Sequence, residues 1–271
     1  MLARWLSRLA DRLILYPTKH PIEVTDKRCL PLNVGEDRVE VWEHDVGPVD
    51  RELDVLVLKF AGTGGRAEYS TDQPACFWPE LRVRLWTVNP PGYGGSTGRA
   101  GVAKLAPTAR AVYEHGKQEA AGRPLVLFAN SLGGTCALHL AARFHVDGLI
   151  LRNPPPLRQI ILARFGWRTG LLGAWLIARQ VPEELDSLAN ARRAMAPAVF
   201  LMSERDTIVP PRHQRLIHQA YRGPKNVVVL KNAGHATSLT PDDVSAYQES
   251  LAWLWLSILA ERQTRRTDTI S

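Results

Sequence analysis

Apolar and polar positions along the chain fall into short segments with two different periodicities. Near-continuous runs of Val, Leu and Ile are typical of strands that are buried on both faces of a sheet. Residues 39–45 instead alternate apolar and polar side chains, as a half-exposed strand does. The predicted strands lie within residues 39–45, 53–65, 83–98, 123–130, 146–155, 196–206 and 225–235.

Helical periodicity occupies the stretches between these strands. The predicted helices cover residues 104–118, 132–144, 210–223 and 242–261. Strands that alternate with helices predict an α/β fold with a mostly parallel central sheet and helices on both faces. Because ligand sites in such sheets lie beyond the carboxyl ends of the strands, the residues that follow each apolar run are the first candidates for chemistry.

The two ends of the chain differ from this pattern. Residues 1–36 are predicted to form an amphipathic helix and a lead-in, and residues 37–271 the main domain. Apolar residues recur at helical spacing at Leu2, Trp5, Leu6, Leu9 and Leu13. Arginines interrupt the run too often for a membrane span, so the helix either packs on the domain, which we favour, or lies on an anionic membrane surface. The polar tail, residues 261–271, is expected to fray.

Composition and charge narrow the function classes. The chain has 271 residues, of which 45% are hydrophobic and 23% charged, as expected for a globular protein with a substantial core. Its net charge of +7 favours anionic surfaces, but no nucleic-acid-binding module is recognisable, so no nucleic-acid partner is expected. The three cysteines form neither a disulfide framework nor a metal-ligand pattern. We therefore expect a reducing, cytoplasmic location and no metal or cofactor.

The stretch LVLFANSLGGTCAL, residues 125–138, places a serine where a buried strand must turn sharply into a helix. The residues two before and two after Ser131 are Ala129 and Gly133, and such a turn needs small residues there to expose the serine Oγ. The Leu132 N–H lies at the helix start, where it can stabilise a developing negative charge. Serine is also a good N-cap, so a purely structural role is the alternative.

At this point the chain resembles the serine α/β-hydrolase family, and within it the esterase-like and lysophospholipase-like members. The resemblance covers residues 37–260 by the order of elements and includes NPPGYGGSTG at 89–98, where the family often has aspartate in place of Asn89. It implies the α/β-hydrolase fold with a helical cap inserted at about 154–195. Asn89 then has a structural role in shaping the floor of the site.

A serine hydroxyl needs a base to become a nucleophile, and the chain has eight histidines. His235 lies on the loop after the last predicted strand, where the family places its base. The alternative for His235 is an ordinary surface loop. The other histidines lie before the serine, in predicted helices or just after the helix that follows the serine, at His20, His44, His115, His139, His145, His213 and His218.

The third member must be a carboxylate that orients the imidazole. Asp206 follows a predicted strand and precedes Ile-Val-Pro, which resembles the acid loop of the family. Glu204 is the local competitor and Asp186 a weaker one. The chain order Ser131, Asp206, His235 is the order expected for this fold.

A second oxyanion donor is expected from the loop after the strand at 53–65, which reads FAGTGG at residues 60–65. Many family members have His-Gly where this chain has Ala61-Gly62. Alignment with that motif assigns the donor to the Thr63 N–H, and a backbone donor survives the loss of the histidine side chain.

Residues 157–182, within the predicted cap, are rich in Leu, Ile, Phe and Trp, with arginines between them. An apolar cap favours lipid-like acyl substrates, and its arginines favour an anionic group or membrane surface. The alternative is that these residues only pack the cap onto the body. Trp253 and Trp255 in the final helix are expected to pack on the sheet.

The resemblance implies a serine hydrolase that cleaves a small-molecule carboxylic ester or thioester through an acyl-enzyme intermediate. A peptidase or an acyltransferase on the same triad is the enzymatic alternative, and a catalytically silent binding protein is the other. Serine at the nucleophile position argues against dehalogenase and epoxide-hydrolase chemistry, which use an aspartate there.

Overall fold

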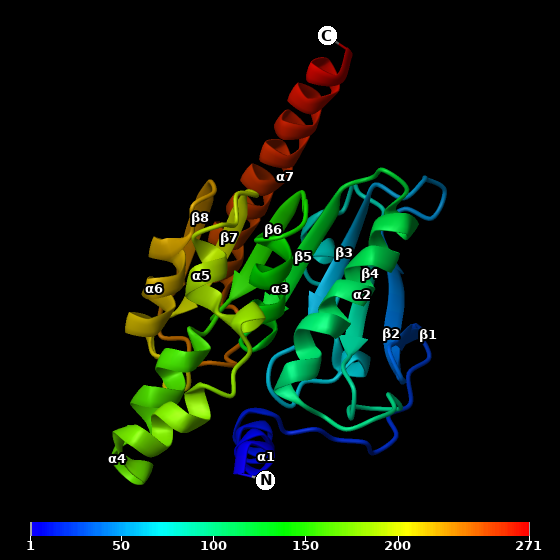
Figure 1. The fold of residues 1–271 in the computed structure, drawn as a ribbon. Coiled ribbons are helices and arrows are strands. Elements are labelled where there is room, and N and C mark those ends of the chain that lie inside the picture. Colours follow the sequence, from blue (N-terminus) through cyan, green and yellow to red (C-terminus); the bar gives the residue numbers. More distant parts are fainter. Residues whose placement is uncertain (1, 271) are drawn as a thin grey trace.

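The computed structural model describes residues 2–270, and within this range it leaves the side chains of 2–4, 167–169, 266 and 268–270 undescribed. The described chain folds around an eight-stranded sheet with the order β1-β2-β4-β3-β5-β6-β7-β8 (Figure 1). The strands are β1 (Arg28–Val34), β2 (Asp37–Val46), β3 (Val55–Phe60), β4 (Val83–Asn89), β5 (Leu125–Asn130), β6 (Gly148–Arg152), β7 (Ala198–Ser203) and β8 (Lys225–Leu230). β1 and β2 are antiparallel to their neighbours and the other strands run parallel, which confirms the predicted α/β-hydrolase fold.

Helices cover both faces of the sheet (Figure 1). They are α1 (Leu2–Ile14), α2 (Val102–Ala120), α3 (Gly133–Ala141), α4 (Leu157–Ala178), α5 (Ser187–Ala191), α6 (Pro211–Ala220) and α7 (Pro241–Ile270), with short 3₁₀ turns η1 (Ala67–Tyr69), η2 (Ala75–Phe77) and η3 (Glu183–Leu185). Side chains alternate between the faces along each strand. In β3, Leu56 and Leu58 join the core under α2 and α3, whereas Val55 and Val57 join the core under α7 and η2.

Two segments differ from the sequence-based expectation. Strand β1 lies inside the segment assigned to the lead-in, where it forms the edge of the sheet. The tail that was expected to fray is helical, since α7 continues to Ile270. Two contacts stabilise the first part of this extension: Arg262 donates to Asp147 Oδ1 at 2.9 Å, and Arg265 pairs with Glu261 one turn earlier.

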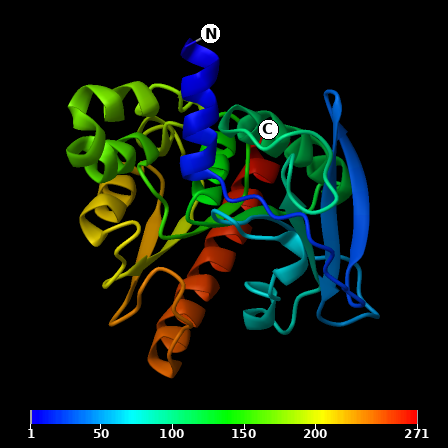
Figure 2. The same cartoon turned by 90° about the horizontal axis from the view of Figure 1, so that it is seen from below.

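The amphipathic helix α1 packs on the domain through Leu6, Ala10 and Ile14, which are buried. It contacts α2 and α4, and Figure 2 shows it standing beside α4. Asp11 Oδ1 accepts a hydrogen bond from Val102 N at 2.8 Å and so caps the first turn of α2. Trp5 lies on the opposite side and is 60% exposed.

Helix α4 occupies the segment predicted as a cap, between β6 and β7. Gly170, with φ 71° and ψ 159°, breaks its helical geometry, and only glycine adopts this conformation without strain. The chain after this kink exposes Leu171 and Leu172. None of the helices in residues 2–270 combines the length and the apolarity that crossing a membrane requires.

Candidate active site

Ser131 lies in the turn between β5 and α3, with φ at +47°. A non-glycine residue in this region is strained, and such strain is concentrated at functional turns. The turn is held by its backbone: Ser131 N donates to Arg152 O at 2.8 Å and Gly134 N donates to Ser131 O at 2.8 Å. A side chain at Gly133 would overlap the carbonyl of Phe60, so a glycine is needed for α3 to begin this close to β3.

The loop after β3 lies directly against this serine. A Cβ added to Gly62 would stand 3.2 Å from Ser131 Cβ, so the absence of a side chain leaves the space beside the hydroxyl open. Gly65 N donates to Gly62 O at 3.0 Å and closes a tight turn around Thr63. Within residues 2–270, neither the Thr63 N–H nor the Leu132 N–H donates a hydrogen bond to another residue. Both donors are therefore available to a ligand oxygen.

His235 and Asp206 come from the loops after β8 and β7, and the structure brings them together. The distance between His235 Nδ1 and Asp206 Oδ2 is 2.6 Å. The Asp206 side chain is fully buried, whereas that of His235 is 20% exposed. The other carboxylate oxygen accepts from Ile208 N and Val209 N, both at 2.8 Å, and Gln214 Nε2 lies 3.2 Å from Oδ2. The carboxylate is thus fixed on three sides and leaves one direction for the imidazole.

The two competing carboxylates lie elsewhere. Glu204 is exposed and accepts no hydrogen bond among the described residues. Asp186 caps α5 through the Ala189 N–H and lies 3.3 Å from Arg158. Of the three acids that the sequence analysis considered, Asp206 is therefore the one that contacts His235.

Asn153 is a residue of this site that the sequence analysis missed. It is 1% exposed and has φ at +50°, a conformation that asparagine tolerates better than most residues. Its Oδ1 accepts from Ser203 N at 2.9 Å, and its Nδ2 donates to Ser203 Oγ at 3.0 Å and to His235 O at 3.1 Å. The signal in the sequence is a single amide at a strand end, followed by three prolines.

A second asparagine, Asn89 at the end of β4, supports the loop after β3. Its Oδ1 accepts from Ala67 N at 2.8 Å, while its Nδ2 donates to Glu68 Oε2 at 2.9 Å and to Glu40 Oε2 at 3.0 Å. An aspartate here would place a third carboxylate against these two glutamates. The amide therefore suits this chain, because it both accepts from the loop and donates to the acids.

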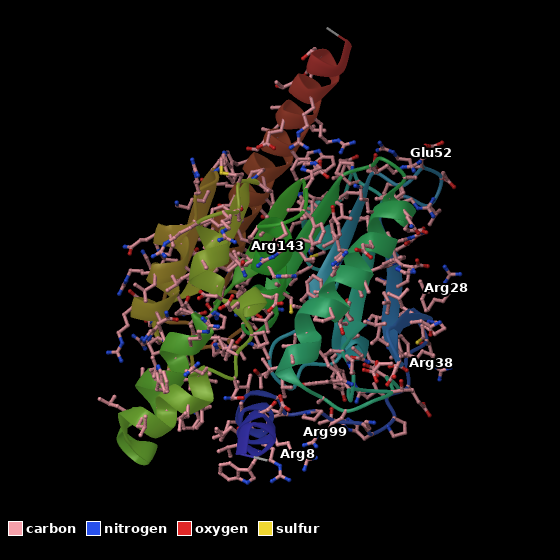
Figure 3. The ribbon with its side chains drawn as sticks, viewed as in Figure 1. Arg8, Arg28, Arg38, Glu52, Arg99 and Arg143 are labelled. Carbon is pink, nitrogen blue, oxygen red and sulfur yellow. The ribbon has the colours of Figure 1, made fainter. Side chains whose placement is uncertain are left out.

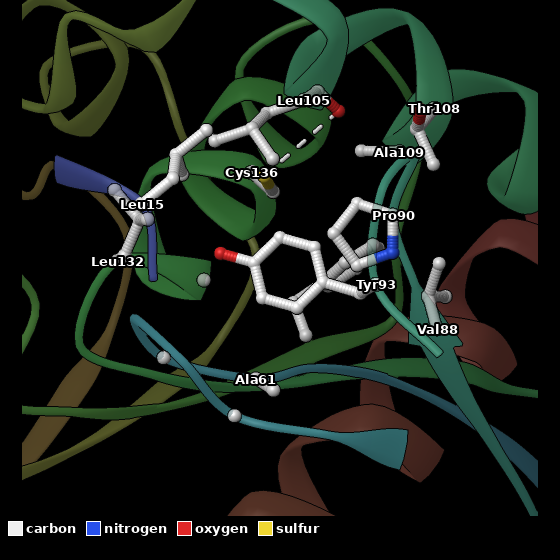
Figure 4. A pocket seen from close by; sticks show the side chains of 14 residues that line it. Leu15, Ala61, Val88, Pro90, Tyr93, Leu105, Thr108, Ala109, Leu132 and Cys136 are labelled. Carbon is white, nitrogen blue, oxygen red and sulfur yellow. Dashed lines mark hydrogen bonds between the residues drawn. The ribbon is translucent and has the colours of Figure 1, made fainter. Parts of the chain in front are cut away.

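Two cavities border the serine turn on opposite faces of the sheet. The smaller, about 40 Å³, is apolar and lies on the α2 and α3 face, around the ring of Tyr93 (Figure 4). The larger, about 320 Å³, is polar, lies on the α7 face and reaches Gly62, Asn130 and Ala236. Its lining includes three basic residues, Lys59, Arg66 and Arg152.

Lys59 is the least expected member of this lining, because it is only 4% exposed. It continues the apolar row of Val55 and Val57 along β3, and its Nζ lies 5.1 Å from the centre of the Phe128 ring. Burial lowers the pKa of Lys59 to about 7, while the nearby charge of Asp72 opposes this shift. The buried lysine therefore works against folding wherever it must carry its charge.

Comparison with known proteins agrees with this architecture. The model of the Alpha/beta hydrolase family matches residues 55–247. A protein of Saccharomyces cerevisiae named as an uncharacterized membrane protein, YNL320W, is 25% identical over 220 residues, which are 76% of this chain and 75% of that protein. Protein bem46 of Schizosaccharomyces pombe is 24% identical over 218 residues, 74% of this chain and 71% of that protein.

Solved structures share the fold at low sequence identity. An esterase of Pyrococcus furiosus superposes with a TM-score of 0.66 at 13% identity, covering 89% of this chain and 97% of that one. Est1E of Butyrivibrio proteoclasticus gives a TM-score of 0.65 at 16% identity, covering 86% of this chain and 99% of that one. At these identities the likeness extends to the fold alone.

Replacing Lys59 by methionine should stabilise the protein, and the gain should depend on pH. Because the folded-state pKa is lowered, the unfolded chain binds more protons between pH 7 and 10.5, and the cost of burying Lys59 is largest below this window. We expect Lys59→Met to raise the free energy of unfolding by on the order of 3 kcal/mol at pH 6 and by much less near pH 10. Denaturant unfolding at both pH values measures this.

The matched control is Lys117→Met, which removes the same charge from an exposed position on α2. It should leave the pH dependence of unfolding unchanged. An equal stability gain for Lys59→Met at both pH values would contradict the assignment of the cost to a buried charge.

Proposed function

We propose that this chain, which belongs to the Alpha/beta hydrolase family, cleaves carboxylic esters or thioesters with Ser131, His235 and Asp206 as its catalytic residues. The observation that carries the proposal is the 2.6 Å hydrogen bond between His235 and the buried Asp206. A histidine oriented in this way is the base that a serine nucleophile needs. Among the described residues no hydrogen bond joins Ser131 and His235. Arg152 links their two loops, because its carbonyl accepts from Ser131 N and its side chain donates to Thr237 O. Esterases among the structural neighbours support an ester-cleaving reaction.

In the proposed reaction, Ser131 Oγ attacks the substrate carbonyl while His235 Nε2 accepts the hydroxyl proton. Asp206 stabilises the imidazolium through Nδ1, and the Thr63 and Leu132 N–H groups stabilise the oxyanion of the tetrahedral intermediate. His235 then returns the proton to the leaving alcohol or thiol, and an acyl-enzyme remains. Water, deprotonated by His235, attacks the acyl carbon, releases the acid and restores the serine hydroxyl.

A peptidase, an acyltransferase and a silent binding protein remain the alternatives. The first two use the same triad and differ in leaving group or in the acceptor of the acyl chain. A catalytically silent binding protein would keep the fold but have a Ser131 that is not reactive. The open space at Gly62 and the two N–H groups without partners argue for a working oxyanion site.

A fluorophosphonate reagent should label the wild-type protein at Ser131 and should not label Ser131→Ala. The same substitution should abolish hydrolysis of p-nitrophenyl butyrate, because no other residue supplies the nucleophile. Ser245→Ala, at an exposed position on α7, is the control and should keep both properties. If the wild-type protein took no label and hydrolysed no short ester, the proposed hydrolase activity would be refuted.

Asp206→Asn should lower kcat by about 10⁴-fold, the cost of the same change in another Ser-His-Asp triad. The amide oxygen would keep accepting from Ile208 N and Val209 N, so the amide NH₂ would face Nδ1, hold the imidazole in the wrong tautomer and remove the stabilising negative charge. Glu204→Gln should change kcat little, since Glu204 is exposed and contacts no group of the site. Steady-state kinetics with thermal unfolding of each variant measures this. If Glu204→Gln proved the more damaging change, the acid would be misassigned.

We further infer a cytoplasmic protein that contacts an anionic membrane peripherally. Helix α1 exposes Trp5, and Arg8 lies on its outer side (Figure 3). Helix α4, which contacts α1, exposes Leu171 and Leu172 at 77% and 70%. Apolar side chains beside arginines suit the interface of an anionic bilayer, and the net charge of +7 adds a general attraction.

The double substitution Leu171→Ser and Leu172→Ser should weaken binding to vesicles that contain phosphatidylserine by several-fold, because it removes the exposed apolar surface. Co-sedimentation with such vesicles, and with pure phosphatidylcholine vesicles, measures the effect. Leu256→Ser, at a 67% exposed position on α7, is the matched control and should bind like wild type. Equal binding of all proteins to both vesicle types would contradict the inferred surface.

A further inference from the structure

The cavity of about 320 Å³ beside the serine turn is lined by two basic side chains without a carboxylate at ion-pairing distance. Among the described residues, no carboxylate oxygen lies within 4 Å of the side-chain nitrogens of Lys59 or Arg152. The third basic residue, Arg66, is different, because it is paired with Glu68 and donates to Thr18 O at 3.0 Å. Lys59 and Arg152 thus form no close ion pair, although the charge of Asp72 acts on Lys59 and the charges of Asp206 and Asp243 act on Arg152 from farther away.

Lys59 has unused hydrogen-bonding capacity as well as charge. Its Nζ donates to Thr71 O, which accounts for one of the three N–H groups of an ammonium. The remaining contact is the face of the Phe128 ring. A buried lysine that is neither paired with an acid nor fully hydrogen-bonded is costly, and such costs are typically retained where a ligand completes the site.

Arg152 lies at the end of β6, next to the proposed catalytic groups. Its Nη2 donates to Thr237 O on the loop that carries His235, and its backbone carbonyl accepts from Ser131 N. The Nε atom is buried without a hydrogen-bond partner. A guanidinium in this state can still donate to an anion in the cavity.

The strand register shows how far Lys59 and Arg152 lie from Ser131. Lys59 is paired with Phe128, three residues before Ser131, and Arg152 is paired with Asn130, one residue before it. At about 3.3 Å per residue, the Lys59 Cα lies on the order of 10 Å along the strand from the serine. The apolar cavity on the opposite face has a volume of only about 40 Å³, so a charged end of a substrate is not expected to bind there.

We propose that the larger cavity binds an anionic group of the substrate, a carboxylate or a phosphate, between Lys59 and Arg152, so that the enzyme prefers esters with a negatively charged end. This inference rests on the proposed function, because it assigns the substrate class of the same site. The bound anion supplies the close ion-pair partner that Lys59 and Arg152 lack, and it lies within one short acyl chain or leaving group of the scissile carbonyl.

The test compares kcat/KM for charged and neutral esters of equal length. One series carries the carboxylate on the acyl side, as p-nitrophenyl half-esters of glutarate, adipate and suberate, and another carries it on the alcohol side, as 4-carboxyphenyl butyrate. We expect wild type to prefer the charged ester in at least one series, and Lys59→Met to reduce that charged-to-neutral ratio by about tenfold. Lys117→Met should retain the wild-type ratio.

An independent measurement is direct binding of suberate by calorimetry, which does not require turnover. Wild type should bind suberate at least tenfold more tightly than Lys59→Met does. Hydrolysis of neutral esters with no preference in either series and no suberate binding would overturn this inference and leave the proposed hydrolase intact. Suberate binding that is lost in Lys59→Met, without hydrolysis of any ester, would support the anion site and refute the hydrolase.

Discussion

The side-chain amide of Asn153 joins three strand ends that are far apart in the sequence. It binds the end of β7 through Ser203 and the loop after β8 through the His235 carbonyl, while the preceding residue, Arg152, holds the Ser131 turn through its own carbonyl. The relative placement of serine and histidine therefore depends on Arg152, the last residue of β6, and on Asn153, which follows it. Because the amide is buried and uses both its oxygen and its nitrogen, replacing it with aspartate or leucine would leave buried groups unpaired.

Asn89 supports the loop after β3 in the same way that Asn153 supports the loop that carries His235. Each amide accepts a backbone N–H with its oxygen and donates to a second element with its nitrogen. Backbone donors can stabilise an oxyanion only if they are held in place before the charge develops. The rigidity of the proposed site thus comes from buried amides that form no hydrogen bond with Ser131 among the described residues.

The sequence predicted most of the fold, because the buried strands are nearly continuous apolar runs and the helices between them have clear periodicity. It missed the edge strand β1, which lies within the predicted lead-in. It also placed Asp206 and His235 on the loops where they meet, since the positions after strand ends converge in any parallel sheet. It could not reveal Asn153, whose role depends on partners 50 and 82 residues away. It also missed the continuation of α7 to Ile270, because Arg262 binds Asp147 only in the folded chain.

Lys59 shows most clearly why residue type alone was insufficient. The sequence analysis did not single out this lysine in the run VLVLKF, and alternation along the strand places it under the loop at Thr71, on the face that α7 covers. A hydrophobic residue would fill that position at lower cost, as valine does at the two equivalent positions before it. The charge is kept at the point where this apolar row reaches a polar cavity beside the serine turn. Under the proposed anion site, stability and substrate preference are therefore opposing demands on one side chain, because the buried lysine that would bind the anion lowers the stability of the fold.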